Sequence, residues 1–393
     1  MLSNSSISPP VFSAETSAGR QKFMISNLQD LNSFAVQGLV PMFNGNALRF
    51  CQRLVKTEKG MVQQGISDRY TIICLLGLWQ MEKNGFRMPF NLHAILDSFL
   101  GDTKWLESFG DLGLLIWLVA QAAPDRLEET MERFSVKSAL ERFPAAREGN
   151  TTELAWFLTG LAEAALVSLE EKSSLDDLAQ TAFREVKQNQ GKSGLFRHLH
   201  RRKSWKGILR GRIGNFADQV YPIYAFSRFA QAYGNEEALE SARLCARGII
   251  REQGHLGQWW WLYDSASGKV VRRYPVYSVH QEGMGPMALF ALSEVSRDDL
   301  SDPIYKGLRW ISGENELHEN LCDPSSTVIW RCIRARRLWT MYFNDFRNFL
   351  SGSHAEESGP NLNVLYECWP YELGWLLYAF AGRSHGQALS KSV

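Results

Sequence analysis

Polar and apolar residues follow one another in blocks along this chain. One block pattern occurs six times: an acidic residue stands at the start of a long apolar segment. Free backbone N–H groups and the helix dipole stabilise a carboxylate at a helix amino terminus. An apolar segment without a polar stripe predicts a helix that is buried on all sides. The six acidic residues are Asp68, Asp111, Glu153, Asp218, Glu282 and Glu372.

More polar segments accompany these apolar ones, which predicts helical hairpins. The predicted helical pairs span 66–100, 111–142, 151–189 (its second helix from 174), 215–252 and 281–312, with further helices over 25–57, 328–350 and 369–382. Six buried helices with polar partners predict a closed ring. The expected fold is therefore all-α, an α/α toroid of six hairpins with the acidic residues collected at one pole.

Such a ring would use nearly all of the 393 residues as one domain, because its repeats share one core. We expect residues 1–24 to be a disordered lead-in, 25–382 to form the toroid, and 383–393 to be a flexible tail. No apolar run approaches the ~18 residues of a membrane span. No charged segment followed by an apolar one marks a secretion signal. We therefore expect a cytoplasmic protein without a membrane span.

The longer gaps between repeats contain insertions. Residues 190–214 form a basic, Gly-punctuated loop, and 351–363 form a Gly/Ser/Glu loop. Two aromatic and β-branched runs flank a Ser/Gly turn within 259–277, which predicts the one β-hairpin of the chain. Insertions that lead directly into buried helices are expected to lie over the polar pole, where loops often carry function.

Charge and cysteine content exclude several classes of function. The net charge of +1 argues against a nucleic-acid or other polyanion binder. The six cysteines include no CxxC pair and predict buried thiols rather than disulfides or metal ligands. Residues 283–288 fit a G-x-G-x-x-A pattern, but no alternation of strand and helix surrounds it. We expect no cofactor and no metal, and the sequence carries no signal for an oligomeric state.

Residues 254–282 combine indoles, phenols, carboxylates and an imidazole. Sugar rings stack on indoles and need polar partners for their hydroxyls, whereas carbocations need aromatic faces. Trp259 and Trp261 should share one face of an extended segment, with Trp260 on the other. A hairpin that only packs over the ring is the alternative. Residues predicted to bind substrate are Trp259, Trp261, Tyr263, Arg272, Arg273, Gln281, Gln219, Tyr221, Trp369, Tyr371, Glu372 and Asp111.

Acid–base chemistry is predicted where loop meets buried helix. Glu282, His280 and Asp218 are the candidates, with Tyr274 as a phenolic partner. Two carboxylates facing each other across a ring could cleave a glycosidic bond, with their separation setting the outcome. The alternative is that Glu282, like Asp111 and Glu153, only caps a helix.

The stretch 257–292, GQWWWLYDSASGKVVRRYPVYSVHQEGMGPMALFAL, resembles the loop–hairpin–inner-helix unit of α/α toroid enzymes. These include the six-hairpin glycosidases, uronate lyases and sugar epimerases, and also the terpenoid cyclase and prenyltransferase toroids. The resemblance implies stacking tryptophans and acid–base residues on such loops. The DxDD motif and repeated QxxDGxW text of the cyclases are missing, as is the zinc-binding Cys/His set of LanC-type toroids.

Three hypotheses follow. The first is a carbohydrate-active toroid, in polysaccharide biosynthesis, that hydrolyses, epimerises or eliminates a saccharide or saccharide conjugate. The second is a terpenoid cyclase-like enzyme acting on a prenyl substrate, and the third is a non-catalytic toroid that binds a glycan or protein. Polar side chains beside Trp in the pocket would favour the sugar, and a closed apolar pocket with one acid would favour the terpene.

Overall fold

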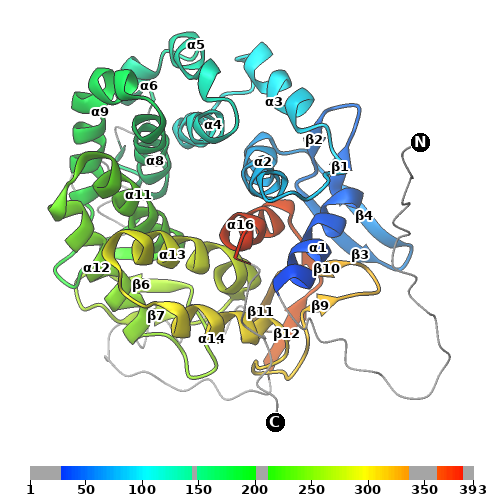
Figure 1. Cartoon of the computed structure of the whole chain (residues 1–393). Coiled ribbons are helices and arrows are strands. Elements are labelled where there is room, and N and C mark those ends of the chain that lie inside the picture. Colours follow the sequence, from blue (N-terminus) through cyan, green and yellow to red (C-terminus); the bar gives the residue numbers. More distant parts are fainter. Residues whose placement is uncertain (1–27, 144–147, 201–210, 336–360, 384–393) are drawn as a thin grey trace, which may run out of the picture.

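The computed structural model describes residues 28–143, 148–200, 211–335 and 361–383. Six helices surround the centre of a ring (Figure 1). They are α2 (Asp68–Lys83), α4 (Phe109–Ala122), α8 (Thr151–Val167), α11 (Ala217–Tyr233), α13 (Gly285–Ser296) and α16 (Pro370–Phe380). Each packs against the next, and α16 packs against α2, which closes the ring. The predicted α/α toroid is confirmed.

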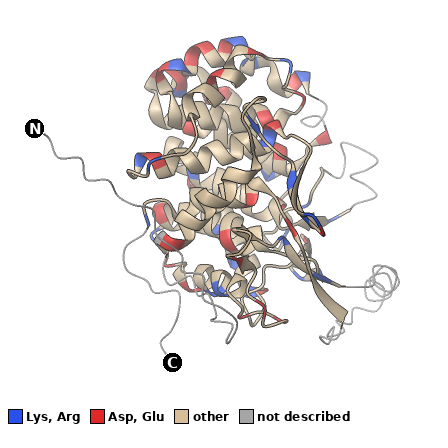
Figure 2. Ribbon diagram, turned by 90° about the vertical axis from the view of Figure 1, so that its right-hand side faces the viewer, with Lys and Arg blue, Asp and Glu red and all other residues tan. Residues whose placement is uncertain are grey.

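A second layer of helices surrounds the inner ring. It contains α3 (Leu92–Gly101), α5 (Leu127–Arg133), α6 (Ala139–Arg142), α9 (Leu169–Lys187), α12 (Glu236–Arg251) and α14 (Ser301–Ile311). These helices bury one stripe only; α12, for example, buries Leu239, Cys245 and Ile249 while its acidic and basic residues face outward. The charged residues therefore lie mainly on the outside of the ring (Figure 2).

Glycines let the inner helices approach one another closely. A Cβ atom at Gly77 of α2 would lie 2.2 Å from the carbonyl oxygen of Gly374 in α16. Likewise a Cβ atom at Gly160 of α8 would lie 2.5 Å from the carbonyl oxygen of Gly113 in α4. Only glycine fits at these contacts. The close approach packs α2 against α16 and α4 against α8 in the core of the ring.

Short strands connect the helices. The chain forms β1 (Phe43–Asn44), β2 (Arg49–Phe50), β3 (Arg53–Thr57), β4 (Gly60–Gln64), β5 (Ile213–Asn215), β6 (Leu262–Asp264), β7 (Val270–Arg272), β8 (Val276–Tyr277), β9 (Cys322–Asp323), β10 (Val328–Ile329), β11 (Cys332–Ala335), β12 (Leu362–Leu365) and β13 (Glu367–Cys368). The predicted hairpin is β6–β7, joined by β5 into one sheet. Strands β4, β5, β8 and β13 directly precede inner helices, so they lie at the pole where those helices start.

Single turns of other helix types complete the fold. The described residues include the 3₁₀ turns η1 (Val40–Met42), η2 (Pro124–Arg126) and η3 (Val136–Ser138). They also include a π-helical turn, η4 (His280–Met284), which continues into α13. The π turn contains the residues that the sequence singled out at this junction.

Two predicted helices are partly wrong. The helix expected over 328–350 is replaced at its start by β10 and β11, because β-branched residues there pair with β9, β8 and β12. Its remainder, 336–350, lies outside the described residues. In the described part of 25–57, α1 (Leu28–Leu39) is followed by the 3₁₀ turn η1 and then by β1, β2 and β3. Helix α1 packs on α16 and takes an outer position beside it.

Two smaller expectations also change. The sequence predicted one β-hairpin, but β3 and β4 form a second, and further strand pairs lie near the carboxyl terminus. The second helix of the third pair starts at Leu169 rather than at 174, because Ser168 caps it. The lead-in 1–24, most of the tail 383–393 and the centre of the basic loop lie outside the described residues.

The six cysteines are free and buried, as expected. Among the helices of the described ranges, none combines the length and apolar content that crossing a bilayer requires.

Candidate functional site

Acidic residues gather where the inner helices start. Asp68, Asp111, Glu153, Asp218 and Glu372 each lie in the first turn of an inner helix, and Glu282 lies in η4, just before α13. Contacts join several of them: Arg69 Nε lies 2.5 Å from Asp111 Oδ1, and Arg69 Nη2 lies 3.8 Å from Glu153 Oε1. The predicted polar pole is present.

A cavity of about 220 Å³ opens at this amino-terminal pole. Its walls come from the first turns of the inner helices and from the strands that precede them. The described residues that line it are Arg69, Tyr70, Ile73, Thr152, Trp156, Asn215, Ala217, Tyr221, Trp261, Tyr277, His280, Met284, Arg331 and Tyr371. Aromatic rings and two guanidinium groups dominate this lining.

Aromatic side chains form most of the cavity wall. The rings of Tyr70 and Tyr371 are 4.6 Å apart. On the other side, Trp261 lies parallel to His280, with an interplanar angle of 11°. Trp261 also contacts Tyr277, at 5.1 Å between ring centroids. Rings held by their neighbours in this way offer preformed faces for a ligand.

Two arginines line the cavity, and each forms an ion pair with a carboxylate outside the cavity lining. Arg69 is held by Asp111 and donates through Nη2 to Ser108 Oγ (2.7 Å). Arg331, between β10 and β11, donates through Nη1 to Glu372 Oε1 (2.8 Å) and lies 3.6 Å from the ring centre of Trp369. The arginines line the cavity, while their carboxylate partners do not.

Two predicted carboxylates are buried behind this wall. Burial raises the pKa of Glu372 to about 7, although Arg331 acts in the opposite direction. Glu282 is also fully buried, and neither carboxyl oxygen has a hydrogen-bond partner among the described residues. Burial, and then the charge of Glu372, raise the pKa of Glu282 well above its usual range. Glu282 lies outside the cavity lining.

Asp218 also lies behind the wall, but it is fully hydrogen-bonded. It accepts hydrogen bonds from Thr152 Oγ1 (2.9 Å) and from the backbone N–H of Asn215 (2.8 Å). The imidazole Nδ1 of His198 lies 3.0 Å from its carboxylate. Because Thr152 and Asn215 line the cavity, Asp218 orients groups at the wall and does not itself reach the space inside.

His280 is the predicted acid–base residue that does line the cavity. Burial lowers its pKa to about 3, opposed in part by a hydrogen bond to the Trp259 backbone, so its imidazole is neutral at neutral pH. Its Nδ1 atom has no hydrogen-bond partner among the described residues. A neutral imidazole of this kind can accept a proton or a hydrogen bond from a ligand hydroxyl.

The three consecutive tryptophans occupy different environments. Trp259 is fully buried and packs against Phe216, at 5.6 Å between ring centroids. Trp260 points to the other side, where its Nε1 donates to the Glu252 carbonyl (2.8 Å). Of the three, Trp261 alone is among the residues that line the cavity.

Other predicted residues shape the pole without lining the cavity. Gln219 and Gln281 are fully buried and tie loops to helix starts, through Phe196 and Trp259 respectively. Tyr263 is buried, and its hydroxyl accepts a hydrogen bond from the Trp260 backbone N–H (3.1 Å). Tyr274 donates to Glu316 Oε1 (2.8 Å).

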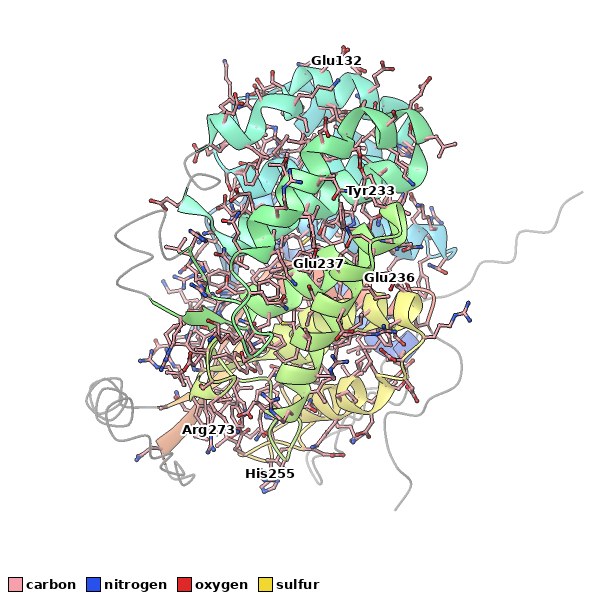
Figure 3. All side chains as sticks on the ribbon, turned by 90° about the vertical axis from the view of Figure 1, so that its left-hand side faces the viewer. Glu132, Tyr233, Glu236, Glu237, His255 and Arg273 are labelled. Carbon is pink, nitrogen blue, oxygen red and sulfur yellow. The ribbon has the colours of Figure 1, made fainter. Side chains whose placement is uncertain are left out.

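The predicted anion-binding arginines lie at the edge of the hairpin. Arg272 is half-buried at the end of β7 and does not line the cavity. Arg273 is exposed and lies over the ring of Trp260, at 5.3 Å. In the side view it appears at the periphery, toward the end where the inner helices start (Figure 3). The predicted residues that do line the cavity are Trp261, Tyr221, Tyr371 and His280.

Sequence reasoning missed Arg69, Tyr70, Trp156, Tyr277 and Arg331 as site residues. Arg69 and Tyr70 directly follow Asp68, and Trp156 lies three residues after Glu153, so position at a helix start was the available signal. For Arg331 the available signal was a cluster of arginines able to bind an anion, but its position at the pole depends on the pairing of β11 with β8 and β12.

No protein-family model and no curated protein sequence matches the chain. Solved structures do match. An unsaturated glucuronyl hydrolase specific for heparin has a TM-score of 0.56 at 14% identity, over 90% of this chain and 95% of that one. A possible member of the GH105 family from Klebsiella pneumoniae has a TM-score of 0.58 at 12% identity, over 94% of each chain.

A glycoside hydrolase family 76 mannosidase from Bacteroides thetaiotaomicron also matches. Its TM-score is 0.56 at 10% identity, over 91% of this chain and 98% of that one. At such identities the likeness concerns the fold. These structures confirm the expected resemblance to (α/α)6 toroid glycosidases at the level of architecture.

Proposed function

We propose that the protein is a carbohydrate-active toroid that takes up a saccharide unit in the cavity at the amino-terminal pole. The observation that carries this proposal is the joint presence of Arg69 and Arg331 in a cavity walled by aromatic rings. Apolar faces with a few fixed polar groups are typical of small-ligand sites. The names of the solved structures with this fold, a glucuronyl hydrolase and a mannosidase, agree with a saccharide.

The geometry favours a sugar that carries a carboxylate. A guanidinium group matches a carboxylate with two parallel N–H donors. Arg69 and Arg331 are pre-oriented by Asp111 and Glu372, so less freedom is lost when a ligand binds. Drug-sized ligands occupy cavities of about 300–1,000 Å³. A cavity of about 220 Å³ is smaller and suits one sugar ring rather than a longer oligosaccharide.

Catalysis is proposed through His280, with Asp218 orienting Thr152 and Asn215 at the cavity wall. A neutral imidazole can take up a proton during hydrolysis, epimerisation or elimination, and the three reactions remain alternatives. The His280→Asn variant is expected to keep saccharide binding while lowering turnover by about 100-fold or more. Full activity in this variant would remove His280 from the reaction.

A non-catalytic saccharide-binding toroid is the second candidate. It is favoured by one observation: no carboxylate is among the described residues that line the cavity. Steady binding of a uronate-bearing saccharide without any product over a long incubation would select it. A terpenoid cyclase-like function is not favoured, because guanidinium and amide groups line the described part of the cavity and no acid is among them.

Trp259 and Trp261 provide a matched pair for testing the site. Trp261→Ala should weaken binding of a uronate-bearing disaccharide and leave the melting temperature nearly unchanged, because Trp261 is half-buried at the wall. Trp259→Ala should instead destabilise the fold by about 3–5 kcal/mol, as large-to-small changes in a core do. A melting temperature that collapses in Trp261→Ala, with binding intact in the folded fraction, would contradict the proposal.

A cytoplasmic location and a role in polysaccharide biosynthesis stay proposals. Cell fractionation tests the first. The second predicts that deleting the gene alters the cell's polysaccharides, and an unchanged saccharide profile would contradict it.

A further inference from the structure

A second cavity, of about 440 Å³, opens at the opposite end of the ring. Its lining residues lie near the carboxyl ends of inner helices: Gln80 in α2, Gln121 in α4, Arg228 in α11, Glu294 in α13 and Tyr378 in α16. The first cavity takes its lining from the starts of the same helices. The two spaces are therefore at opposite poles, and Tyr233, the last residue of α11, marks this second end in Figure 3.

A continuous hydrogen-bond network forms one wall of this second cavity. Gln80 Nε2 donates to Gln121 Oε1 (2.7 Å), and Gln121 Nε2 donates to the hydroxyl of Tyr378 (2.8 Å). The hydroxyls of Tyr378 and Tyr224 are 2.7 Å apart, and Tyr224 donates to Glu163 Oε1 (3.1 Å). Helices α2, α4, α8, α11 and α16 each supply at least one group, so the network is built by the ring as a whole.

The charges at this wall are matched in pairs. Glu163 is 2% exposed and accepts two hydrogen bonds from Arg228, at 2.6 and 3.0 Å. Arg383 pairs with Glu294. The carboxyl ends of six helices converge here, and their last carbonyl groups disfavour an anion. Balanced charges therefore suit a neutral ligand that carries hydroxyl groups.

The opposite wall is apolar. It is formed by Met287, Phe290 and Ala291 of α13 and by Ala379 and Ala381 at the end of α16. A ligand for this space needs one face of C–H groups and another of hydroxyls. That combination is the chemistry of a sugar ring or a cyclic polyol.

An aromatic column separates the two cavities. Tyr221, in the lining of the first, contacts Trp375 (5.9 Å), which contacts the fully buried Trp117 (5.4 Å). Trp117 stacks on Tyr224 (4.8 Å) in the lining of the second cavity and donates through Nε1 to the hydroxyl of Tyr378 (3.2 Å). A single ligand therefore cannot occupy both cavities.

We propose that the carboxy-terminal pole is a second binding site, which takes a neutral sugar or cyclic polyol on Gln80, Gln121 and Tyr378. This site does not depend on the function proposed for the first cavity. It differs in chemistry, because no carboxylate is among the described residues that line the first cavity, whereas the lining of the second pairs Arg383 with Glu294 and adds the amides of Gln80 and Gln121.

Titration of the full chain with glucose, maltose and myo-inositol, read by calorimetry and by tryptophan fluorescence, tests this site. Ala381 lies after α16 with ordinary extended backbone angles and lines the cavity, so Ala381→Trp should block the space without breaking the network. Gln80→Ala removes one network donor. Gln63→Ala, on exposed β4, is the matched control.

We expect saturable binding in wild type, Gln63→Ala and Trp261→Ala, at least a tenfold loss in Gln80→Ala, and none in Ala381→Trp. Glucose or maltose binding with no response to inositol would identify a sugar site, and the reverse would identify a polyol site. Absence of saturable binding in the wild type would overturn the proposal, as would binding that survives Ala381→Trp or disappears only in Trp261→Ala.

Discussion

At the residue scale, the amino-terminal pole contains two ionisable groups whose burial acts in opposite directions. His280 is neutral because burial lowers its pKa to about 3. For Glu282, burial and the charge of Glu372 raise the pKa well above its usual range. The sequence placed both residues at the right junction. It could not show that Glu282 turns away from the cavity, because the π-helical turn that carries both residues has no simple side-chain period.

His280 predicts a loss of stability in acid. The unfolded chain takes up a proton at this imidazole near pH 6.5, whereas the folded chain does so only near pH 3. Between these values the unfolded state binds more protons, so the free energy of unfolding falls as the pH is lowered from about 6.5 toward 3. The His280→Asn variant should lose this component in urea titrations across the range, while His255→Asn, at an exposed site, should keep it. Parallel pH profiles for wild type and His280→Asn would contradict the burial argument.

Glu282 predicts the opposite dependence. Its raised pKa means that the folded state retains a proton that the unfolded state loses above about pH 4.5, so stability falls as the pH rises from there toward the folded pKa. Glu282→Gln cannot ionise. The variant's stability relative to wild type should therefore grow as the pH increases from 5 to 9, measured by chemical denaturation. A constant difference would show that the Glu282 carboxyl does not titrate as a buried group.

At the scale of elements, the buried helices were predictable and the strands were not. Apolar segments such as 112–120 in α4 can only be buried helices, and local capping residues set their starts. The strands are two to five residues long, and several pair with distant partners, as β13 does with β3. Such pairing depends on contacts between remote parts of the chain. This is why a helix was expected over 328–350, where β10 and β11 lie, and why Arg331 was not placed at the pole.

Helix contact distances lead to a stability prediction. Gly77→Ala in α2 would place a methyl group against the backbone of α16, and overpacking of this kind costs about 1–3 kcal/mol. Gly101→Ala in α3 is the control, since no atom lies within 4 Å of the added carbon. Thermal unfolding should show a lower melting temperature in the first variant only. Equal melting temperatures would mean that α2 and α16 pack less closely than the structure shows.

At the scale of the whole molecule, the ring organises two chemically different ends around one aromatic core. The sequence predicted the closed ring and its polar pole, because each repeat alone carries the signal for a buried helix. It did not predict that α1 completes the outer layer beside α16, since that contact joins the two ends of the chain. Nor did it indicate the second cavity, whose network comes from the polar ends of otherwise apolar helices.

The central claim is that Arg69 and Arg331 bind a saccharide carboxylate at the amino-terminal pole. The most direct test is the dissociation constant of a uronate-bearing disaccharide for wild type, Arg331→Gln and Arg273→Gln. Arg273 is an exposed arginine outside the cavity and serves as the matched control. A hydrogen bond to a charged group contributes about 1.5–3 kcal/mol, which corresponds to an affinity loss of about tenfold to hundredfold in Arg331→Gln. The Arg273→Gln variant is expected to bind the disaccharide with the wild-type affinity. Equal affinities in all three proteins, with the fold intact, would contradict the account.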